Sequence, residues 1–464
     1  MRSMRLSAAA LAIPVFVAGC SFIPTYERPE APVPGSFPYE SATQGTPAAA
    51  LDWQQFFADP RLREMIATAL ANNRDLRVAV LNIEQARAQY DIRSADRLPS
   101  VGAAAAISRA PASGGGGGTA TNYTVGLALS SWEIDFFGRI ASLSEAALAQ
   151  YLATEEGRKA AQISLVSSVA NGWLNLVADE ELLAVTRQTL ATREESLRLT
   201  RLRFENGVSS ELDFRQAQSL AEAARVALAQ QQRQQALDAN SLSLLLGRPV
   251  SPAIAAGTPI ATVTLPDVPA GLPSDVLARR PDVRQAEQQL VAANANIGAA
   301  RAAFFPRITL TAGIGTASSS LSGLFEGGTW GFTAAPQLLQ PIFDAGRNRA
   351  GLRSAQVNRE IAVAQYERAI QTAFREVSDA LAGRVALADQ LRAQNNVAEA
   401  EAVRLRLSTL RYENGVASFL ELLDAQRSLF TARQAQIQTR LQLLQNQVLL
   451  YRALGGGWSD VAVQ

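Results

Sequence analysis

Apolar residues recur at helical spacing over most of the chain. From Asp59 to about residue 97 they lie three or four positions apart, with Asp59 and Pro60 as the expected N-cap and first turn, and a matching pattern covers residues 274–297. Two longer, proline-free patterns follow in the two halves of the chain. The first, residues 138–205, predicts a helix of roughly 100 Å at about 1.5 Å per residue, which is far longer than a globular core requires.

Each long pattern is interrupted only by an Asn-Gly pair, Asn206-Gly207 in the first and Asn414-Gly415 in the second. Both residue types tolerate positive φ, which suits a tight connection between two antiparallel helices. The pattern therefore predicts two long helical hairpins, whose returning helices cover residues 212–246 and 420–454. Their expected N-caps are two serines that follow the glycines, Ser210 and Ser418.

Between the shorter and the longer helical patterns, apolar residues alternate with small or polar ones. The alternation covers residues 123–130 and 308–315, and the expected partner strands are residues 101–108 and 330–338. One apolar face and one small or polar face are typical of a transmembrane β-strand, although a soluble sheet shows the same period. Four strands cannot close a barrel, and an open edge is not tolerated in lipid. Several chains must therefore contribute to one barrel, and three chains would supply twelve strands.

The chain contains two copies of one pattern. Residues 197–211 read LRLTRLRFENGVSSE and residues 405–419 read LRLSTLRYENGVASF, which places Asn206 and Asn414 208 positions apart (414 − 206). A repeat of this length is a half-domain, since solenoid periods are roughly 20 to 50 residues. We therefore expect two tandem structural repeats, residues 59–257 and 258–464, each with a helix, two strands and a long helical hairpin.

The first residues resemble a bacterial lipoprotein signal. Arg2 and Arg5 precede an apolar stretch, residues 6–17, that is too short to span a bilayer, and the stretch ends in the lipobox-like Val17-Ala18-Gly19-Cys20. The resemblance implies a signal peptide at residues 1–19 and lipidation of Cys20, the single cysteine. An ordinary signal peptide with a cysteine at its cleavage site is the alternative. By the lipoprotein sorting pattern, Ser21 indicates the outer membrane, and the proline-rich start of residues 20–58 predicts an extended tether.

Composition excludes most catalytic chemistry. The 464 residues include no histidine and one cysteine, so the common zinc and copper ligands and the usual base of a catalytic triad are missing. No acidic pair lies in a loop rich in glycine or aromatic residues, as a glycosidase site requires. The formal net charge is +1, which leaves no basic field for nucleic acid. We therefore expect no enzyme activity, no metal site, no cofactor and no nucleic-acid partner.

Six short motifs add to the lipobox: NRDLR at residues 73–77, SWEIDFFGR at 131–139, RFENGV at 203–208, RRPDVR at 279–284, QPIFDAG at 340–346 and LDAQR at 423–427. Together they resemble the TolC/OprM-like outer membrane efflux proteins, in particular the NodT-type lipoprotein branch that serves resistance-nodulation-division drug pumps. The resemblance covers nearly the whole chain after the signal.

This resemblance implies an α+β membrane protein. The expected fold is a homotrimer with a 12-stranded transmembrane β-barrel, four strands per chain, continued by a long periplasmic α-helical barrel. The expected function is the outer membrane duct of a tripartite efflux system. Such a duct passes drugs or other small molecules to the exterior from an inner-membrane resistance-nodulation-division transporter and a periplasmic adaptor (membrane fusion) protein.

The resemblance also implies a periplasmic gate at Leu420, Asp424 and Arg427. Spacings of four and three residues place them on one helix face. In a trimer each residue forms a ring, in which three Asp424 carboxylates repel, bind a cation or pair with Arg427. The alternative for Asp424 and Arg427 is a surface ion pair within one helix, worth about 0 to 1 kcal/mol. The first copy has uncharged residues at these places, namely Leu212, Gln216 and Ser219.

Two further roles follow from the resemblance. Tyr412 and Asp179 resemble a latch that holds the inner and outer hairpins together. The adaptor is expected to contact the two hairpin tips, which consist of Asn206, Gly207, Val208, Asn414, Gly415 and Val416. Without the resemblance, the tip residues would indicate only helix caps.

Three other functions stay open at this point. A related duct would serve type I protein secretion or metal-ion export, and the absence of histidine and the presence of only three methionines give no support to metal relay. The third is a structural trimeric lipoprotein with a coiled-coil stalk. It requires that the alternating strands form no pore.

Overall fold

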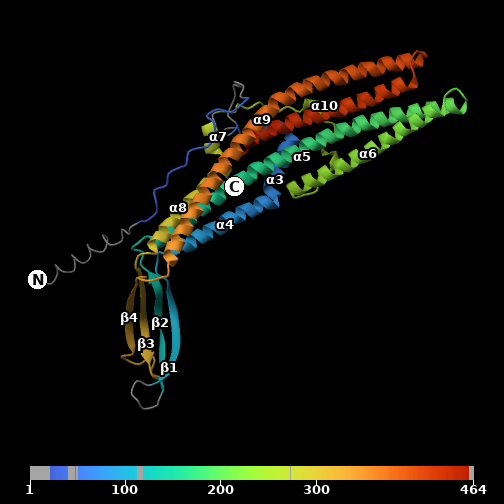
Figure 1. Ribbon diagram of the computed structural model, residues 1–464. Helices are drawn as coiled ribbons and strands as arrows, with labels where there is room; N and C mark the ends of the chain where they lie inside the picture. The colour runs from blue at the N-terminus through green and yellow to red at the C-terminus, as the bar shows by residue number, and fades with distance from the viewer. Residues whose placement is uncertain (1–20, 40–47, 49–50, 112–118, 272, 459–464) are drawn as a thin grey trace. The chain divides into compact units, whose positions relative to one another are not determined.

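The computed structural model describes residues 21–39, 48, 51–111, 119–271 and 273–458 (Figure 1). The chain forms two compact units. The first consists of the described residues of Met1–Glu30, Asn82–Glu155 and Gln285–Arg368, and the second of the described residues of Ala31–Leu81, Glu156–Arg284 and Ala369–Gln464. Each of the two expected repeats therefore contributes residues to both units. The expected signal peptide and Cys20 lie outside the described residues.

The two halves of the chain contain the same order of main elements. In the first half, helix α4 (Arg74–Ala95) is followed by strands β1 (Val101–Pro111) and β2 (Thr119–Glu133) and by helices α5 (Arg139–Glu205) and α6 (Glu211–Leu246). In the second half, α8 (Pro281–Ala302) is followed by β3 (Arg307–Ser318), β4 (Trp330–Leu339), α9 (Arg347–Glu413) and α10 (Phe419–Ala453). Helices α5 and α9 have 67 residues each. The helix, two strands and long helical pair thus follow one another in the same order in both halves.

The shorter helical pattern of the first half is broken, although we expected one helix. Helix α3 (Pro60–Asn72) begins as predicted, because the Asp59 carboxylate accepts hydrogen bonds from the first free N–H groups. Asn73 then separates α3 from α4. Its buried side chain accepts from the N–H group of Leu76 and donates to the carbonyl of Leu245, both at 2.9 Å. These two bonds fix the break between the helices.

The pattern of the second half is broken at the corresponding place. Helix α7 (Pro273–Arg279) ends before Arg280, and Pro281 starts α8, a position where the missing N–H group of proline costs nothing. The buried Arg280 guanidinium donates to Asp282 at 2.6 Å, to Glu376 at 2.8 Å and to the carbonyl of Ala453 at 2.9 Å. These hydrogen bonds connect the junction between α7 and α8 to helices α9 and α10.

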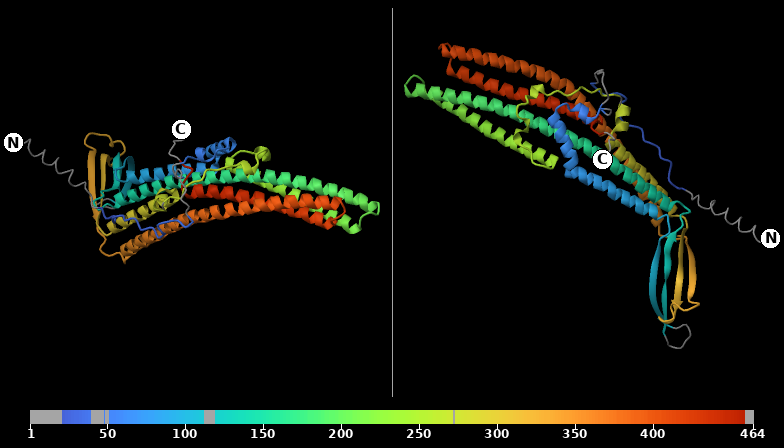
Figure 2. Two further views of the ribbon diagram at one scale, coloured as in Figure 1. Left: turned by 90° about the horizontal axis from the view of Figure 1, so that it is seen from above. Right: turned by 180° about the vertical axis from the view of Figure 1, so that it is seen from behind.

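Helices α5 and α6 form one hairpin, and α9 and α10 form a second hairpin beside it (Figure 2). Gly207 and Gly415 adopt φ of 69° and 72° at the two turns, so the predicted need for residues that tolerate positive φ is confirmed. Ser210 and Ser418 cap the returning helices through their hydroxyl groups, as predicted. Among the described residues, no helix has both the length and the apolar character needed to cross a membrane.

The four strands form one antiparallel sheet in the order β1, β2, β3, β4 (Figure 1). One row across the sheet joins Ala103, Leu127, Ile314 and Phe332. The next row, on the opposite face, joins Ala104, Gly126, Gly315 and Gly331. Leu127, Ile314 and Phe332 are 52%, 55% and 80% exposed. One face therefore exposes large apolar side chains and the other consists of small residues in this region, as the period of two predicts.

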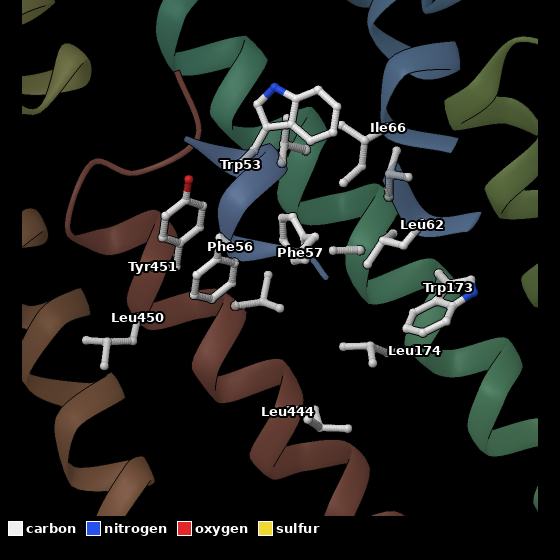
Figure 3. Close-up of a cluster of buried hydrophobic side chains, with 14 of the residues drawn as sticks. Trp53, Phe56, Phe57, Leu62, Ile66, Trp173, Leu174, Leu444, Leu450 and Tyr451 are labelled. Atoms are coloured by element: carbon white, nitrogen blue, oxygen red, sulfur yellow. The ribbon is translucent and has the colours of Figure 1, made fainter. Parts of the chain in front are cut away.

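The largest hydrophobic core lies in the second unit (Figure 3). Phe56, from the short helix α2 (Trp53–Phe56), stacks on Tyr451 of α10 with 3.9 Å between ring centroids. Phe57 packs edge-on against the same ring at 6.2 Å, and the Tyr451 hydroxyl donates to the carbonyl of Leu51 at 2.7 Å. This core fixes the part of the chain that precedes α3 to the end of α10.

The beginning of the expected tether lies against α8 within the first unit. Arg28 donates to both Glu287 oxygens, at 2.7 and 2.8 Å. Asn294 donates to the carbonyl of Pro24 at 2.7 Å, and Phe22 stacks on Phe305 with 4.6 Å between centroids. The segment has no helix or strand, as its prolines predict, and it is held along a helix surface.

Candidate functional site

The first turns of α10 carry the three residues of the expected gate. Leu420 and Arg427 are exposed and Asp424 is half-buried. The neighbouring positions of the helix are buried instead, namely Phe419, Leu422, Leu423 and Gln426. Leu420, Asp424 and Arg427 therefore lie on the face of α10 that the core leaves uncovered, as their spacing predicts.

Asp424 pairs with a residue that the sequence analysis did not select. Arg404 of α9 donates through Nη2 to Asp424 Oδ2 at 2.5 Å and through Nη1 to Glu401 at 3.2 Å. The hydrogen bond to Asp424 raises the pKa of Arg404 above its ordinary value. No ion pair between Asp424 and Arg427 is present among the described residues, because Arg404 reaches the carboxylate from the other helix of the hairpin. The alternative for these two residues, a surface ion pair within α10, is therefore absent from the described structure.

The partner of Asp424 has a signal in the sequence. Arg404 lies 11 positions before Gly415 (415 − 404) and Asp424 lies 9 positions after it (424 − 415). Residues at similar distances from the turn face each other in an antiparallel hairpin. Counting outward from Gly415 identifies Arg404 as a residue across from Asp424.

The first hairpin has no charge at the corresponding positions. Leu212 and Ser219 are exposed and Gln216 is half-buried. Further along the same helix, Arg225 is an exposed arginine with two carboxylate partners, Glu194 at 2.8 Å and Glu222 at 2.6 Å. The two hairpins therefore differ in charge near their tips.

Tyr412 connects the two hairpins. Arg203, in the last turn of α5, donates to the Tyr412 hydroxyl at 2.6 Å, and its guanidinium lies 5.6 Å from the centroid of the Tyr412 ring. The Tyr412 ring also packs on Phe419 with 5.5 Å between centroids. Arg203 is thus a second residue that the sequence analysis missed, although the RFENGV motif includes it.

Asp179 lies elsewhere in the first hairpin. Its side chain is 5% exposed, and its Oδ1 atom accepts from Gln231 of α6 at 2.7 Å. Burial raises the pKa of Asp179 to about 7, with a further contribution from the neighbouring Asp238 carboxyl. Asp179 lies about seven helical turns before the end of α5, whereas Tyr412 lies in the last turn of α9. The structure therefore does not bring the two expected latch residues together within one chain.

The two tips share one hydrogen-bond pattern. In the first, Asn206 donates from its side chain to the carbonyl of Leu202 at 2.7 Å, and Val208 donates from its N–H group to the carbonyl of Arg203 at 2.8 Å. Together with the left-handed Gly207, this is a Schellman cap. The second tip repeats these bonds with Asn414, Gly415 and Val416. Each tip therefore presents an exposed valine, Val208 or Val416, on a capped turn.

Comparison of the sequence with known proteins gives close relatives. Residues 65–248 and 272–456 match the sequence model of the family described as outer membrane efflux protein. The toluene efflux pump outer membrane protein TtgC of Pseudomonas putida is 48% identical over 468 residues, which cover 98% of this chain and 97% of the relative. The outer membrane protein OprJ of Pseudomonas aeruginosa is 45% identical over 467 residues, with 99% and 98% covered.

Solved structures resemble this one along nearly the whole chain. A membrane protein from Pseudomonas aeruginosa superposes with a TM-score of 0.89 at 45% identity, over 96% of this chain and 100% of that one. The open state of the MtrE outer membrane channel of Neisseria gonorrhoeae gives a TM-score of 0.87 at 41% identity, over 94% and 98%. The combination of long helices and a small sheet is thus the fold of solved outer membrane channels.

Proposed function

Because the chain belongs to the outer membrane efflux protein family, it is the outer membrane channel of an efflux system, and we propose that three copies form one duct with a gate on α10. The protein lies in the outer membrane, extends into the periplasm and is not an enzyme. It passes drugs or other small molecules that an inner-membrane resistance-nodulation-division transporter and a periplasmic adaptor deliver.

The sheet supports the trimeric part of the proposal. Strands β1 and β4 are exposed along their whole length and form the two edges of the four-stranded sheet. Unpaired N–H and C=O groups at such edges are too costly in lipid. Pairing β4 of one chain with β1 of the next closes a barrel of twelve strands. The face with Leu127, Ile314 and Phe332 then contacts lipid, and the face of small residues lines the lumen.

The Arg404–Asp424 contact is the observation that carries the gate. In a trimer, the uncovered face of α10 repeats three times around the axis, so that Leu420, Asp424 and Arg427 each form a ring. Three free carboxylates close to one axis would repel one another. Arg404, on the other helix of the same hairpin, compensates the charge of each Asp424, so that three Asp424 side chains can lie close to the axis. Arg427, which has no ion-pair partner among the residues that the structure describes, supplies a second, basic ring.

The remaining expected sites follow from this arrangement. The capped tips with Val208 and Val416 contact the adaptor, because they are the exposed ends of the two hairpins. The Arg203–Tyr412 bond is the latch between the hairpins, and it takes the place of the expected Tyr412–Asp179 pair. Lipidation of Cys20 adds a second attachment to the membrane beside the strands.

Other functions have less support. The names of the relatives favour efflux of small molecules over type I protein secretion or metal export. A structural trimeric lipoprotein without a pore is at odds with the resemblance to a channel solved in its open state.

Two adjacent substitutions test the barrel. Phe332 lies on the large apolar face of β4 and Thr333 on the opposite face. Phe332→Asp places a charged side chain in lipid. A basic residue at the bilayer midplane destabilises a barrel by about 2 to 4 kcal/mol, and an acidic residue does so somewhat less. We expect this variant to lose insertion and channel activity in planar bilayers, whereas Thr333→Asp inserts as a trimer and conducts. Equal behaviour of the two variants would contradict a barrel with this face toward lipid.

A further inference from the structure

A small cavity between α5 and α10 has a basic and polar lining. Its volume is about 150 Å³, and it lies in the second unit. Gln188, Thr192 and Arg193 contribute from α5, and Gln426, Phe430 and Arg433 contribute from α10. The described lining contains two arginines and no aspartate or glutamate.

Arg193 is a buried cation that has no carboxylate partner among the described residues. The residue is 5% exposed, and its guanidinium lies 5.3 Å from the centroid of the Phe430 ring. Nη1 donates to the carbonyl of Leu220 at 3.2 Å, and Nε has no hydrogen-bond partner among the described residues. Burial lowers the pKa of Arg193, and the charge of Arg427 lowers it further. A buried charge without a counterion is costly.

Two other arginines near this cavity, Arg427 and Arg433, also lack a carboxylate partner in the described part of the chain. Arg433 donates to the amide oxygen of Gln188 at 3.3 Å. Within the described part of the chain, no carboxylate forms an ion pair with Arg193, Arg427 or Arg433, whereas Arg404 has two acidic partners. The excess positive charge is therefore local to the contact between α5 and α10.

Gln426 provides a second observation that points to a ligand. It is 9% exposed and lines the same cavity, and its Oε1 atom has no partner among the described residues. The site thus combines an unused donor, Arg193 Nε, with an unused acceptor, and because both atoms are buried in the cavity wall, a ligand reaches them only when the two side chains turn toward the cavity. A partly protonated oxyanion satisfies both, because its oxygens accept from arginine and its hydroxyl donates to the amide oxygen.

We propose that this cavity binds one small oxyanion of the phosphate class between Arg193 and Arg433. A water molecule occupies about 30 Å³ in the liquid, so the cavity has room for a tetrahedral anion. The bound anion joins α5 to α10 within a few helical turns of Asp424. Binding is a property of the folded chain and does not depend on duct formation.

Equilibrium dialysis with radiolabelled inorganic phosphate tests the site on the purified full-length protein in a neutral detergent. We expect one saturable site per chain. Arg433→Gln, which removes a partly exposed side chain, should weaken binding at least about tenfold, the loss expected for one charge-assisted contact. Arg193→Gln should have the same effect. Arg225→Gln is the matched control, because Arg225 lies on the other returning helix and already has two carboxylate partners.

Competition identifies the anion class. Displacement by arsenate but not by sulfate, which carries no hydroxyl at neutral pH, supports the partly protonated oxyanion that Gln426 requires, and displacement by acetate as well would contradict a tetrahedral site. The proposal is overturned if the wild type shows no saturable phosphate binding, or if Arg433→Gln binds phosphate as tightly as Arg225→Gln does.

Discussion

Arg404 and Asp424 face each other across the second hairpin, with 2.5 Å between Nη2 and Oδ2. The acidic residue of the proposed gate is thus held by α9 and not by Arg427 on its own helix. The two side chains are 41% and 48% exposed, so solvent screens the pair and it adds little to the stability of the fold. Its main effect is on the charge near the end of the hairpin.

Removal of Arg404 should change ion selectivity. Arg404→Gln leaves three Asp424 carboxylates without partners, and a ring of acidic side chains attracts cations. We expect the cation-to-anion permeability ratio to rise at least about twofold, measured from the reversal potential in a KCl gradient. Arg225→Gln breaks an exposed pair in the first hairpin and is the control. An unchanged reversal potential in Arg404→Gln would argue against Asp424 facing the lumen.

The raised pKa of Asp179 predicts a pH dependence of stability. Its pKa is about 7 in the folded protein and about 3.9 in an unfolded chain. The folded state therefore binds more protons between these values, so its stability falls as the pH rises from about 4 to about 7 and then stays level. Asp179→Asn removes this pH-dependent loss of stability. Above pH 7, its free energy of unfolding should exceed that of the wild type by about 2 kcal/mol once solvent screening is allowed for.

Thermal unfolding at several pH values checks this prediction. The difference in Tm between Asp179→Asn and the wild type should grow with pH. Glu180→Gln is the control, since Glu180 is an adjacent carboxylate that accepts from Gln235 at 3.0 Å. A Tm difference that does not vary with pH would contradict the assignment.

Loss of the Tyr412 hydroxyl should loosen the contact between the hairpins. Tyr412→Phe removes the 2.6 Å bond from Arg203 and keeps the ring contact with Phe419. Losing this hydrogen bond destabilises the closed state by about 1 kcal/mol, which corresponds to a roughly fivefold higher ratio of open to closed channels. Single-channel recordings measure this ratio. Tyr151→Phe, which breaks a bond to Glu155 within one helix, should leave it unchanged.

Two glycines on the same face of the sheet should respond differently to substitution. A Cβ atom at Gly126 would lie 2.3 Å from the carbonyl oxygen of Ile314, whereas no atom lies within 4 Å of a Cβ at Gly331. Gly126→Ala requires the backbones of β2 and β3 to move apart, at a cost of about 1 to 3 kcal/mol. Heating in SDS should dissociate its trimers at a lower temperature than those of Gly331→Ala. Equal stability would show that the strands separate without cost.

Features that depend on nearby residues were predictable from the sequence. The turn at Gly207 and the cap at Ser210 each involve residues within a few positions, and the period of two is a property of each strand alone. The break at Asn73 was not predictable in this way, because its side chain bonds to Leu245, 172 positions away. The pairing of β2 with β3 was not predictable either, since a long helical hairpin separates the two strands in the chain.

The candidate site shows the same division. The spacing of Leu420, Asp424 and Arg427 correctly placed them on one face of α10. The ion-pair partner of Asp424 is on the neighbouring helix, so the spacing within α10 did not reveal the pair with Arg404. Asp179 and Tyr412 were linked by resemblance alone, and their different distances from the hairpin tips separate them.

Single-channel conductance in planar bilayers tests the central claim most directly. The wild type is compared with an Asp424→Ala, Arg427→Ala double variant and with a Gln216→Ala, Ser219→Ala double variant, which changes the corresponding positions of the first hairpin. We predict a small conductance for the wild type and the first-hairpin variant, and a severalfold larger conductance when Asp424 and Arg427 are removed. Equal conductance in all three proteins would contradict a gate at these residues, and no conductance in any of them would contradict the duct.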